Sequence, residues 1–221
     1  MQRIQLLPAT SYWSQRKDTD SPGVECNVTS GANFLMALGL YEDLMPRCPH
    51  LADGSLQRLP DWINDVAEGP HGQGLATADG WNGAPREDHK VLAWAINQVA
   101  AKTVNAFRTD LALDAIFLEI ARGRPVILSG IFGQYLGKDG AMHDRAHVVC
   151  LTGLETAQED VLTAVAVDLT QISAALVADP YGDFHTNYQV QNGSECRFAV
   201  DELMHILSEQ DMPAKWAHVA V

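Results

Sequence analysis

Cysteine chemistry is the first possibility that the residue types suggest, and one cysteine has suitable neighbours. The chain contains four cysteines and no C-x-x-C pair; they are Cys26, Cys48, Cys150 and Cys196. Cys26 opens a helical pattern and has polar or turn-forming residues on both sides. Unpaired backbone N–H groups and the macrodipole at a helix start favour an anion, so they lower the pKa of a thiol placed there. Cys150 lies between Val149 and Leu151, and we expect it to be an inert core residue.

Two residues at the ends of predicted strands could serve a cysteine nucleophile, which needs a base within hydrogen-bond reach and a group that orients the base. His147, one of eight histidines, begins the apolar run 147–152 and follows a polar loop. Asp179 ends the run 174–178, and Pro180 and Gly182 force a turn directly after it. An aspartate before proline is by itself typical of a turn. The predicted set of Cys26, His147 and Asp179 therefore depends on the three residues occurring together.

The elements that must position these residues fall into a helical first half and a strand-rich second half. Apolar residues at helical spacing predict helices, and short β-branched or apolar runs between turn residues predict strands. The predicted helices span 26–40, 55–66, 87–101, 110–122 and 201–207, and the predicted strands span 4–7, 125–129, 147–152, 161–167, 174–178 and 216–221. This order predicts a single α+β domain over 1–221, in which a helical half, about 1–123, packs on a mostly antiparallel sheet, about 124–221.

Two segments of the helical half have unusual compositions. Small residues, including Gly31 and Ala32, line the predicted helix at 26–40, which indicates a central helix that other backbones approach closely. The segment 69–85 contains five glycines and no apolar periodicity, so we expect a long surface loop and a candidate lid. Trp81 lies within this segment and is a candidate substrate contact, whereas Trp94, on a predicted helix, is expected in the core.

The composition limits the classes of partner. Acidic residues number 28 against 15 basic ones, a net charge of −13, and no basic stripe is present, so we expect neither nucleic-acid binding nor docking to anionic membranes. No apolar run approaches the roughly 18–20 residues of a membrane span, and the start lacks the apolar stretch, about 7–15 residues, of a secretory signal. We therefore expect a protein that is made in the cytosol, or that leaves it by a route with no cleavable signal, and that has no disulfides or thiolate-bound zinc.

Five short motifs follow one another in an order found in a known family. They are Tyr12-Trp-Ser-Gln15, Cys26-Asn-Val-Thr29-Ser30 before an aliphatic helix, Gly123-Arg-Pro125-Val, His147-Val-Val with Gly153 after it, and Asp179-Pro-Tyr-Gly182. As a set they resemble the C39-like cysteine peptidases of the papain-like superfamily. The motifs cover nearly the whole chain.

The resemblance implies a papain-like fold and a role for each matched residue. Cys26 would be a nucleophile on a helix, His147 the general base and acid, and Asp179 the group that holds His147. The side-chain amide of Gln15 and the backbone N–H of Cys26 would form the oxyanion hole, where a neutral amide donates without adding a competing charge. Gln15 lies 11 residues before Cys26 across a charged loop, and the connection at 155–175 is longer than the usual hairpin of the family.

The activity that the resemblance implies is that of a thiol protease. It would hydrolyse a peptide amide bond of a peptide or protein substrate through an acyl-enzyme intermediate, with no cofactor or metal. Domains of this family cut leader peptides after small residues or cell-wall peptides such as those of peptidoglycan, and single-domain versions occur in bacteria and bacteriophages. The sequence leaves the substrate, the origin and the oligomeric state open. We expect a cytoplasmic protein, and a virion-associated or released one if it is phage-encoded.

Two other hypotheses compete with a thiol protease. The run His143-Asp-Arg-Ala-His147 has H-x-x-x-H spacing, which on a helix would place two imidazoles as ligands of a zinc hydrolase. Gly137, Gly140 and the β-branched run after His147 argue against a helix there. A non-catalytic binding or structural module could also keep the same fold, because a fold does not imply a function.

Overall fold

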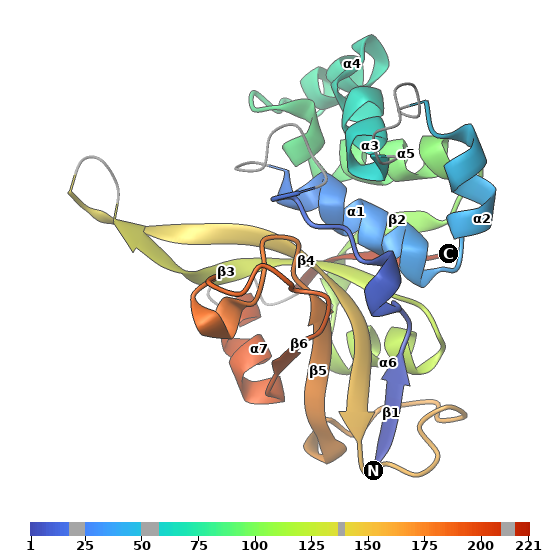
Figure 1. The fold of residues 1–221 in the computed structure, drawn as a ribbon, viewed down its shortest axis with the longest axis vertical. Coiled ribbons are helices and arrows are strands. Elements are labelled where there is room, and N and C mark those ends of the chain that lie inside the picture. The colour runs from blue at the N-terminus through green and yellow to red at the C-terminus, as the bar shows by residue number, and fades with distance from the viewer. Residues whose placement is uncertain (18–24, 50–57, 137–139, 209–214) are drawn as a thin grey trace.

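A seven-stranded antiparallel sheet runs through the structure, which is a computed structural model (Figure 1). The structure describes residues 1–17, 25–49, 58–136, 140–208 and 215–221. The strands follow the order β2-β7-β3-β4-β5-β6, and β1 pairs with β4. Their bounds are β1 Gln2–Gln5, β2 Asn105–Leu111, β3 Val126–Leu136, β4 Met142–Thr156, β5 Ile172–Ala178, β6 Cys196–Phe198 and β7 Lys215–Ala220.

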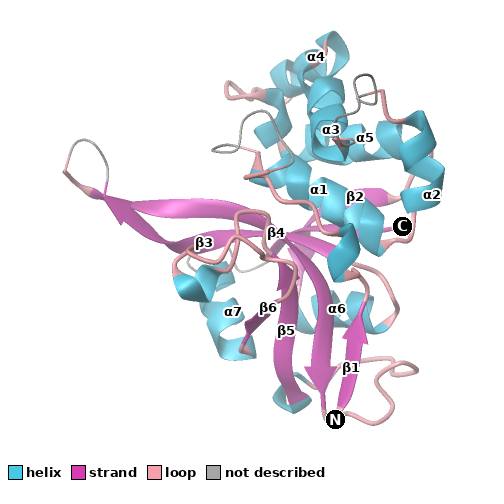
Figure 2. Cartoon of the chain, viewed as in Figure 1, coloured by secondary structure: helices cyan, strands magenta, loops and turns pink. Residues whose placement is uncertain are grey.

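Helices cover both faces of the sheet, with α1 to α5 gathered on one side and α6 and α7 on the other (Figure 2). Their bounds are α1 Cys26–Ala37, α2 Tyr41–Leu44, α3 Leu59–Glu68, α4 Pro70–Ala78, α5 His89–Ala100, α6 Leu113–Ala121 and α7 Val200–Ser208. Successive side chains of a strand point to opposite faces. Ile127 of β3 accordingly joins the core with α1, α3 and α5, whereas Val126 and Leu128 join the core with α6 and α7.

The helix α1 lies at the centre of the structure, as its small residues predicted. Every residue of α1 after Cys26 is buried. A Cβ atom built on Gly31 would lie 3.1 Å from Cδ1 of Ile96 on α5, so a larger residue would push the two helices apart. On the other side, the hydroxyl of Ser30 donates to the carbonyl oxygen of Val148 on β4 at 2.8 Å. This helix therefore joins the helical part directly to the sheet.

The prediction of a surface loop over 69–85 is wrong for its first part, because 70–78 forms α4. Pro70 occupies the start of the helix, where its missing N–H group costs no hydrogen bond. Gly72 makes the bend between α3 and α4 possible, since a Cβ atom there would lie only 2.0 Å from the carbonyl oxygen of Ala67. Gly72 thus serves close helix packing, and only the residues after α4, including Trp81, form a loop.

The predicted strand at 161–167 is also wrong, because this segment forms turns. Val161 and Val167 are only 1% and 4% exposed and pack in the core with α6 and α7, which explains the apolar pattern. The side chain of Gln158 makes the hydrogen bonds to the backbone of this segment that a neighbouring strand would otherwise make. Its side chain donates to the carbonyl oxygen of Ala166 at 3.3 Å and accepts from the N–H of Asp168 at 3.0 Å.

The other predicted elements are present with shifted bounds, and the α+β fold with helices packed on an antiparallel sheet is confirmed. The first residues of the helix predicted at 55–66, and most of the charged loop before Cys26, lie outside the described residues. The start of the helix predicted at 110–122 belongs to β2, which pairs with β7 from Asn105↔Ala220 onward. No described helix is long and apolar enough to cross a membrane.

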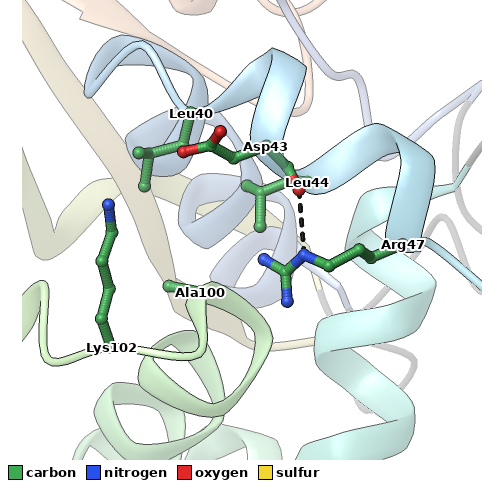
Figure 3. Close-up of a pocket in the computed structure, with 6 residues that line it drawn as sticks. All are labelled: Leu40, Asp43, Leu44, Arg47, Ala100 and Lys102. Atoms are coloured by element: carbon green, nitrogen blue, oxygen red, sulfur yellow. Dashed lines mark hydrogen bonds between the residues drawn. The ribbon is translucent and has the colours of Figure 1, made fainter.

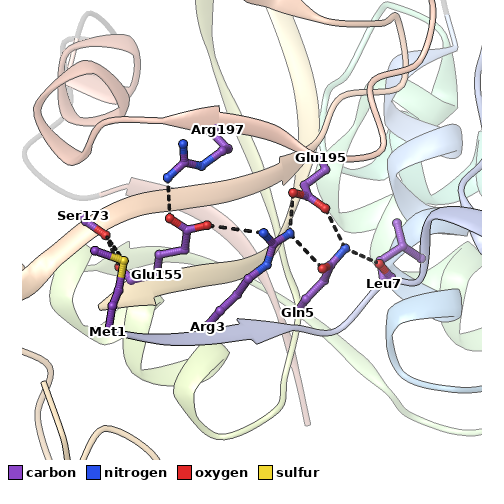
Figure 4. A network of polar contacts seen from close by, with 8 residues as sticks. All are labelled: Met1, Arg3, Gln5, Leu7, Glu155, Ser173, Glu195 and Arg197. Atoms are coloured by element: carbon purple, nitrogen blue, oxygen red, sulfur yellow. Dashed lines mark hydrogen bonds and ion pairs between the residues drawn. The ribbon is translucent and has the colours of Figure 1, made fainter. Parts of the chain in front are cut away.

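Charged side chains fasten the N-terminal strand β1 to the sheet (Figure 4). The guanidinium of Arg3 lies 3.4 Å from Oε1 of Glu155 on β4 and also pairs with Glu195. Glu155 pairs in turn with Arg197 on β6, and Gln5 donates to Glu195 at 3.0 Å. The network therefore links β1 to β4 and to β6. These contacts hold β1 in register with β4.

Candidate active site

Cys26 is the first residue of α1, where the sequence placed it. It is partly exposed, whereas Cys48, Cys150 and Cys196 are buried. The backbone of Glu25, the residue before it, accepts from Thr29 at the first turn of the helix, which fixes the start of α1 at the cysteine. The sulfur thus lies at the end of the helix where N–H groups are unpaired within the helix.

His147 and Asp179 lie side by side, one on a strand and the other at the end of the neighbouring strand. His147 is on β4, and Asp179 directly follows β5. Nε2 of His147 lies 2.8 Å from Oδ1 of Asp179, and Asp179 is fully buried. The same oxygen accepts a hydrogen bond from the backbone N–H of Tyr181 at 2.9 Å. This hydrogen bond lies in the turn that Pro180 and Gly182 predicted. With Nε2 directed to the carboxylate, Nδ1 remains to face the sulfur of Cys26.

The pKa values of Cys26 and His147 move in opposite directions. Burial works to raise the pKa of the Cys26 thiol, but the hydrogen bond and charge of His147, together with a hydrogen bond from the Val148 backbone, lower it below its ordinary value. Burial works to lower the pKa of His147, but the charge and hydrogen bond of Asp179 and the contact with Cys26 raise it to about 10. Both directions favour a thiolate–imidazolium pair at neutral pH.

Aromatic side chains enclose the histidine and the aspartate. The ring of Phe132 meets that of His147 edge-on, with centroids 5.5 Å apart, and Tyr188 does so at 6.3 Å. The hydroxyl of Tyr12 donates to the backbone carbonyl of Asp179. These contacts hold the imidazole ring in place and keep water away from its hydrogen bond with the carboxylate.

Gln15 is buried and lies beside the turn after Asp179. Its backbone N–H donates to the carbonyl oxygen of Pro180 at 2.9 Å. Two residues earlier, the backbone of Trp13 exchanges two hydrogen bonds with the side chain of Asn33 on α1, at 2.8 and 3.0 Å. The segment that carries Gln15 is therefore held between α1 and the Asp179 turn. The side chain of Gln15 is not among those that line the cavity at Cys26, which is described next.

A cavity of about 360 Å³ opens beside the pair of Cys26 and His147. Its other side is formed by residues that the sequence did not mark as a group, Trp81, Glu87 and His89. Trp81 was expected to be a candidate substrate contact, and it does line the cavity. The only local signal for His89 is Asp88, whose side chain caps the N-terminus of α5 by accepting from the N–H groups of Lys90 and Val91.

A second cavity, of about 250 Å³, lies at the other end of α1 and contains none of the predicted site residues (Figure 3). Arg47 is its most prominent cation. Its guanidinium donates to the carbonyl oxygens of Asp43, at 2.9 Å, and Val99, at 3.3 Å. Because Val99 is near the end of α5, the arginine stabilises a helix C-terminus, which is a structural role.

The zinc hypothesis required a helical turn at 143–147, and the structure has a strand there. Residues 142–156 form β4, in which His143 pairs with Tyr135 and His147 with Gly130. Four residues along a strand span about 13 Å, so the two backbones are too far apart for the adjacent placement that the H-x-x-x-H spacing gives on a helix. Within the described residues, no three His, Cys, Asp or Glu side chains gather as a metal site would require.

Comparisons with known proteins bear on the fold. No protein-family model and no curated protein sequence matches the chain. One solved structure, described as a candidate C39-like peptidase from Bacillus anthracis, matches with a TM-score of 0.53 at 12% sequence identity, over 100% of this chain and 98% of that one. At such low identity the likeness concerns the fold alone. The chain therefore has the fold of a C39-like peptidase, as its motifs predicted.

Proposed function

We propose that the chain is a cysteine peptidase that hydrolyses a peptide amide bond with Cys26 as nucleophile. The observation that carries the proposal is the position of His147 between the thiol of Cys26 and the buried carboxylate of Asp179. Nε2 of His147 lies 2.8 Å from Oδ1 of Asp179. Burying a carboxylate costs free energy unless a partner compensates for it. A fold that only binds its partner has no need of that arrangement, so it favours catalysis over a non-catalytic module.

The reaction follows from the protonation states of the pair. The Cys26 thiolate attacks the carbonyl carbon of the peptide, and the electron pair of the C=O bond moves to the oxygen. The backbone N–H of Cys26 donates to this oxyanion, and the side-chain amide of Gln15, to which the family resemblance gives the same role, would reach it from the segment beside the Asp179 turn. The imidazolium of His147 then gives a proton to the leaving nitrogen as the C–N bond breaks, which leaves a thioester on Cys26.

Water completes the cycle through the same histidine. The neutral imidazole takes a proton from water as the water oxygen attacks the thioester carbon, and the C–S bond breaks to return the thiolate. Asp179 holds the ring so that Nδ1 faces the sulfur in both halves of the reaction, and its charge stabilises the imidazolium. No metal or cofactor takes part in these steps.

The experiment that tests the proposal is a screen of the purified protein for peptide hydrolysis. The substrates are a library of peptides, including cleavage sites with small residues, and peptidoglycan. The expected result is turnover that Cys26→Ala abolishes and that the matched control Cys48→Ala keeps, because Cys48 is a buried cysteine of the helical part. An equally active Cys26→Ala protein would refute the thiol mechanism, and a folded wild type without turnover would favour a binding module.

A further inference from the structure

One side of the cavity is lined by Trp81, Glu87 and His89, whose side chains have no part in the reaction steps above. Glu87 ends the 3-10 turn Pro85–Glu87, and His89 begins α5 two residues later. Cys26, His147 and Val148 line the same cavity. A group of the substrate that lies next to the amide bond under attack would therefore contact these three side chains.

The ring of His89 is held by the edge strand β2 and by its neighbour β7. Its Nδ1 lies 3.0 Å from Nε2 of His218 on β7, and Nδ1 of His218 lies 3.0 Å from Oδ1 of Asn105 on β2. Phe107 stacks on the ring at 4.8 Å and Trp216 meets it edge-on at 5.5 Å. His218 and Asn105 are 1% and 2% exposed, so the row of hydrogen bonds ends inside the protein.

The protons along this row determine what His89 offers to the cavity. A carbonyl oxygen can only accept, so Nδ1 of His218 carries the proton that points to Asn105. Nε2 of a neutral His218 then accepts from Nδ1–H of His89, which leaves Nε2 of His89 with a lone pair. Burial lowers the pKa of His89 to about 4 against the opposing charge of Asp88, and burial lowers that of His218 as well, so both rings are neutral at pH 7.

Glu87 brings a carboxylate to the same side of the cavity. The cations one residue before it and three residues after it, Arg86 and Lys90, pair with Glu68 at 2.9 Å and with Asp79 at 2.7 Å. Glu87 also lies close to the indole of Trp81. A Cβ atom on Gly83 would be 2.9 Å from Nε1 of Trp81 and 3.1 Å from Oε2 of Glu87, so Gly83 packs closely against both groups.

We infer that Trp81, Glu87 and His89 form an amine subsite, which binds a positively charged primary amine of the substrate beside the amide bond that Cys26 attacks. An ammonium group has three donors and no acceptor, and it meets here a carboxylate, an imidazole lone pair and an aromatic ring. A substrate carboxylate at this place would face like charge and a lone pair. The inference rests on the proposed peptidase function. The amine is either the free α-amino group of a peptide or the side-chain amine of a lysine-like residue.

Matched peptides test the subsite and identify the source of the amine. One cleavable sequence is made with its α-amine free or acetylated, and with a lysine beside the cleaved bond free or Nε-acetylated. We expect acetylation of one of the two amines to lower kcat/KM of the wild type at least about tenfold, as for loss of a charge-assisted hydrogen bond. Glu87→Gln should bring the ratio of free to acetylated substrate close to one. Glu42→Gln, an exposed acid on α2, should keep the wild-type ratio.

Two results would overturn the subsite. The first is a wild type that treats free and acetylated peptides alike, and the second is a Glu87→Gln protein that loses the same factor on both. Binding of the same peptides to Cys26→Ala protein separates this inference from the peptidase proposal. Amine-dependent binding that Glu87→Gln weakens, without turnover by the wild type, would support the subsite and refute the peptidase. Turnover that ignores the amine would refute the subsite and support the peptidase.

The tautomer of His89 gives an independent measurement. Nitrogen-15 NMR of labelled histidine is expected to show a proton on Nδ1 and none on Nε2 of His89. His218→Phe should remove this preference, because it removes the acceptor of the Nδ1 proton. A proton on Nε2 in the wild type would make His89 a donor to the cavity and would overturn its role as an acceptor for the amine.

Discussion

The substitution Asp179→Asn separates the charge of the aspartate from its role in orienting His147. Oδ1 accepts from two donors, Nε2 of His147 at 2.8 Å and the backbone N–H of Tyr181 at 2.9 Å. Both donors require an oxygen, so an asparagine is expected to turn its carbonyl group toward them. Its amide nitrogen then replaces Oδ2, which is buried and has no hydrogen-bond partner among the described residues. His147 thus keeps its tautomer, and the variant loses only the negative charge.

Two bounds give the magnitude of this loss. Full charges about 4 Å apart interact by about 4 kcal/mol at an effective dielectric constant of about 20, which is an upper limit because the amide oxygen still accepts the hydrogen bond. A charge-assisted hydrogen bond exceeds a neutral one by about 1 kcal/mol, which is a lower limit. Between them we expect the pKa of His147 to fall by about 1–2 units, or about 1.4–2.7 kcal/mol. This corresponds to a fall in kcat/KM of roughly 10- to 100-fold.

The pH dependence of kcat/KM checks the reasoning. Asp179 raises the pKa of His147 against the effect of burial, and an imidazolium is lost as the pH rises through that pKa. The alkaline limb should therefore move to lower pH in Asp179→Asn, measured from about pH 5 to about pH 10. Asp179→Ala leaves both N–H donors without an acceptor and should lose more activity. Three results would refute the claim that Asp179→Asn removes only the charge. They are equal losses of activity in the two variants, an alkaline limb that does not move, and a fall in activity of about 10⁴, as for a wrong tautomer of the histidine.

Limited iodoacetamide at about pH 6 should label Cys26 ahead of the three buried cysteines in mass spectra, and faster labelling of another thiol would contradict its assignment as the nucleophile. Gln15→Ala should lower kcat by about 10²–10³, and an unchanged kcat would show that this amide does not reach the oxyanion. Activity should survive EDTA and His143→Ala, and recovery on adding zinc after chelation would favour a metal hydrolase. Because His89 and His218 stay neutral in the fold, whereas the unfolded chain binds their protons, the free energy of unfolding should decrease as the pH falls from 6.5 to about 4. Urea titrations measure this slope, and His218→Gln should flatten it.

The residues whose local chemistry determines their position could be predicted from the sequence. Polar flanks before an apolar helix placed Cys26 at a helix start, and the turn residues Pro180 and Gly182 placed Asp179 at a strand end. Both features depend on a few neighbours in the chain. The position of His147 could be predicted once the apolar run after it was expected to form a strand. The contact between His147 and Asp179 then follows because β4 and β5 are adjacent in the sheet.

The strand β2 and one side of the cavity could not be predicted, because they depend on contacts between distant parts of the chain. The segment Asn105–Leu111 lacks a β-branched run, and it is a strand because β7, more than a hundred residues later, pairs with it. The side chain of His89 is fixed by His218 and by Phe107, which come from these same two strands. No local pattern marks such a group. The side of the cavity formed by Trp81, Glu87 and His89 therefore becomes visible only in three dimensions.

The place of β7 in the sheet has a consequence for the order in which the fold can form. β7, the last strand along the chain, lies between β2 and β3, and each of them pairs with it. Until Lys215–Ala220 has paired, both neighbours have an open edge, and His89 lacks the histidine that orients it. A chain in which β7 is unpaired therefore has Cys26, His147 and Asp179 in its sequence but has not yet fixed His89 on the other side of the cavity. Pairing of β7 with β2 and β3 is therefore expected late in folding, because it joins segments far apart in the sequence, and His89 gains its contact with His218 only then.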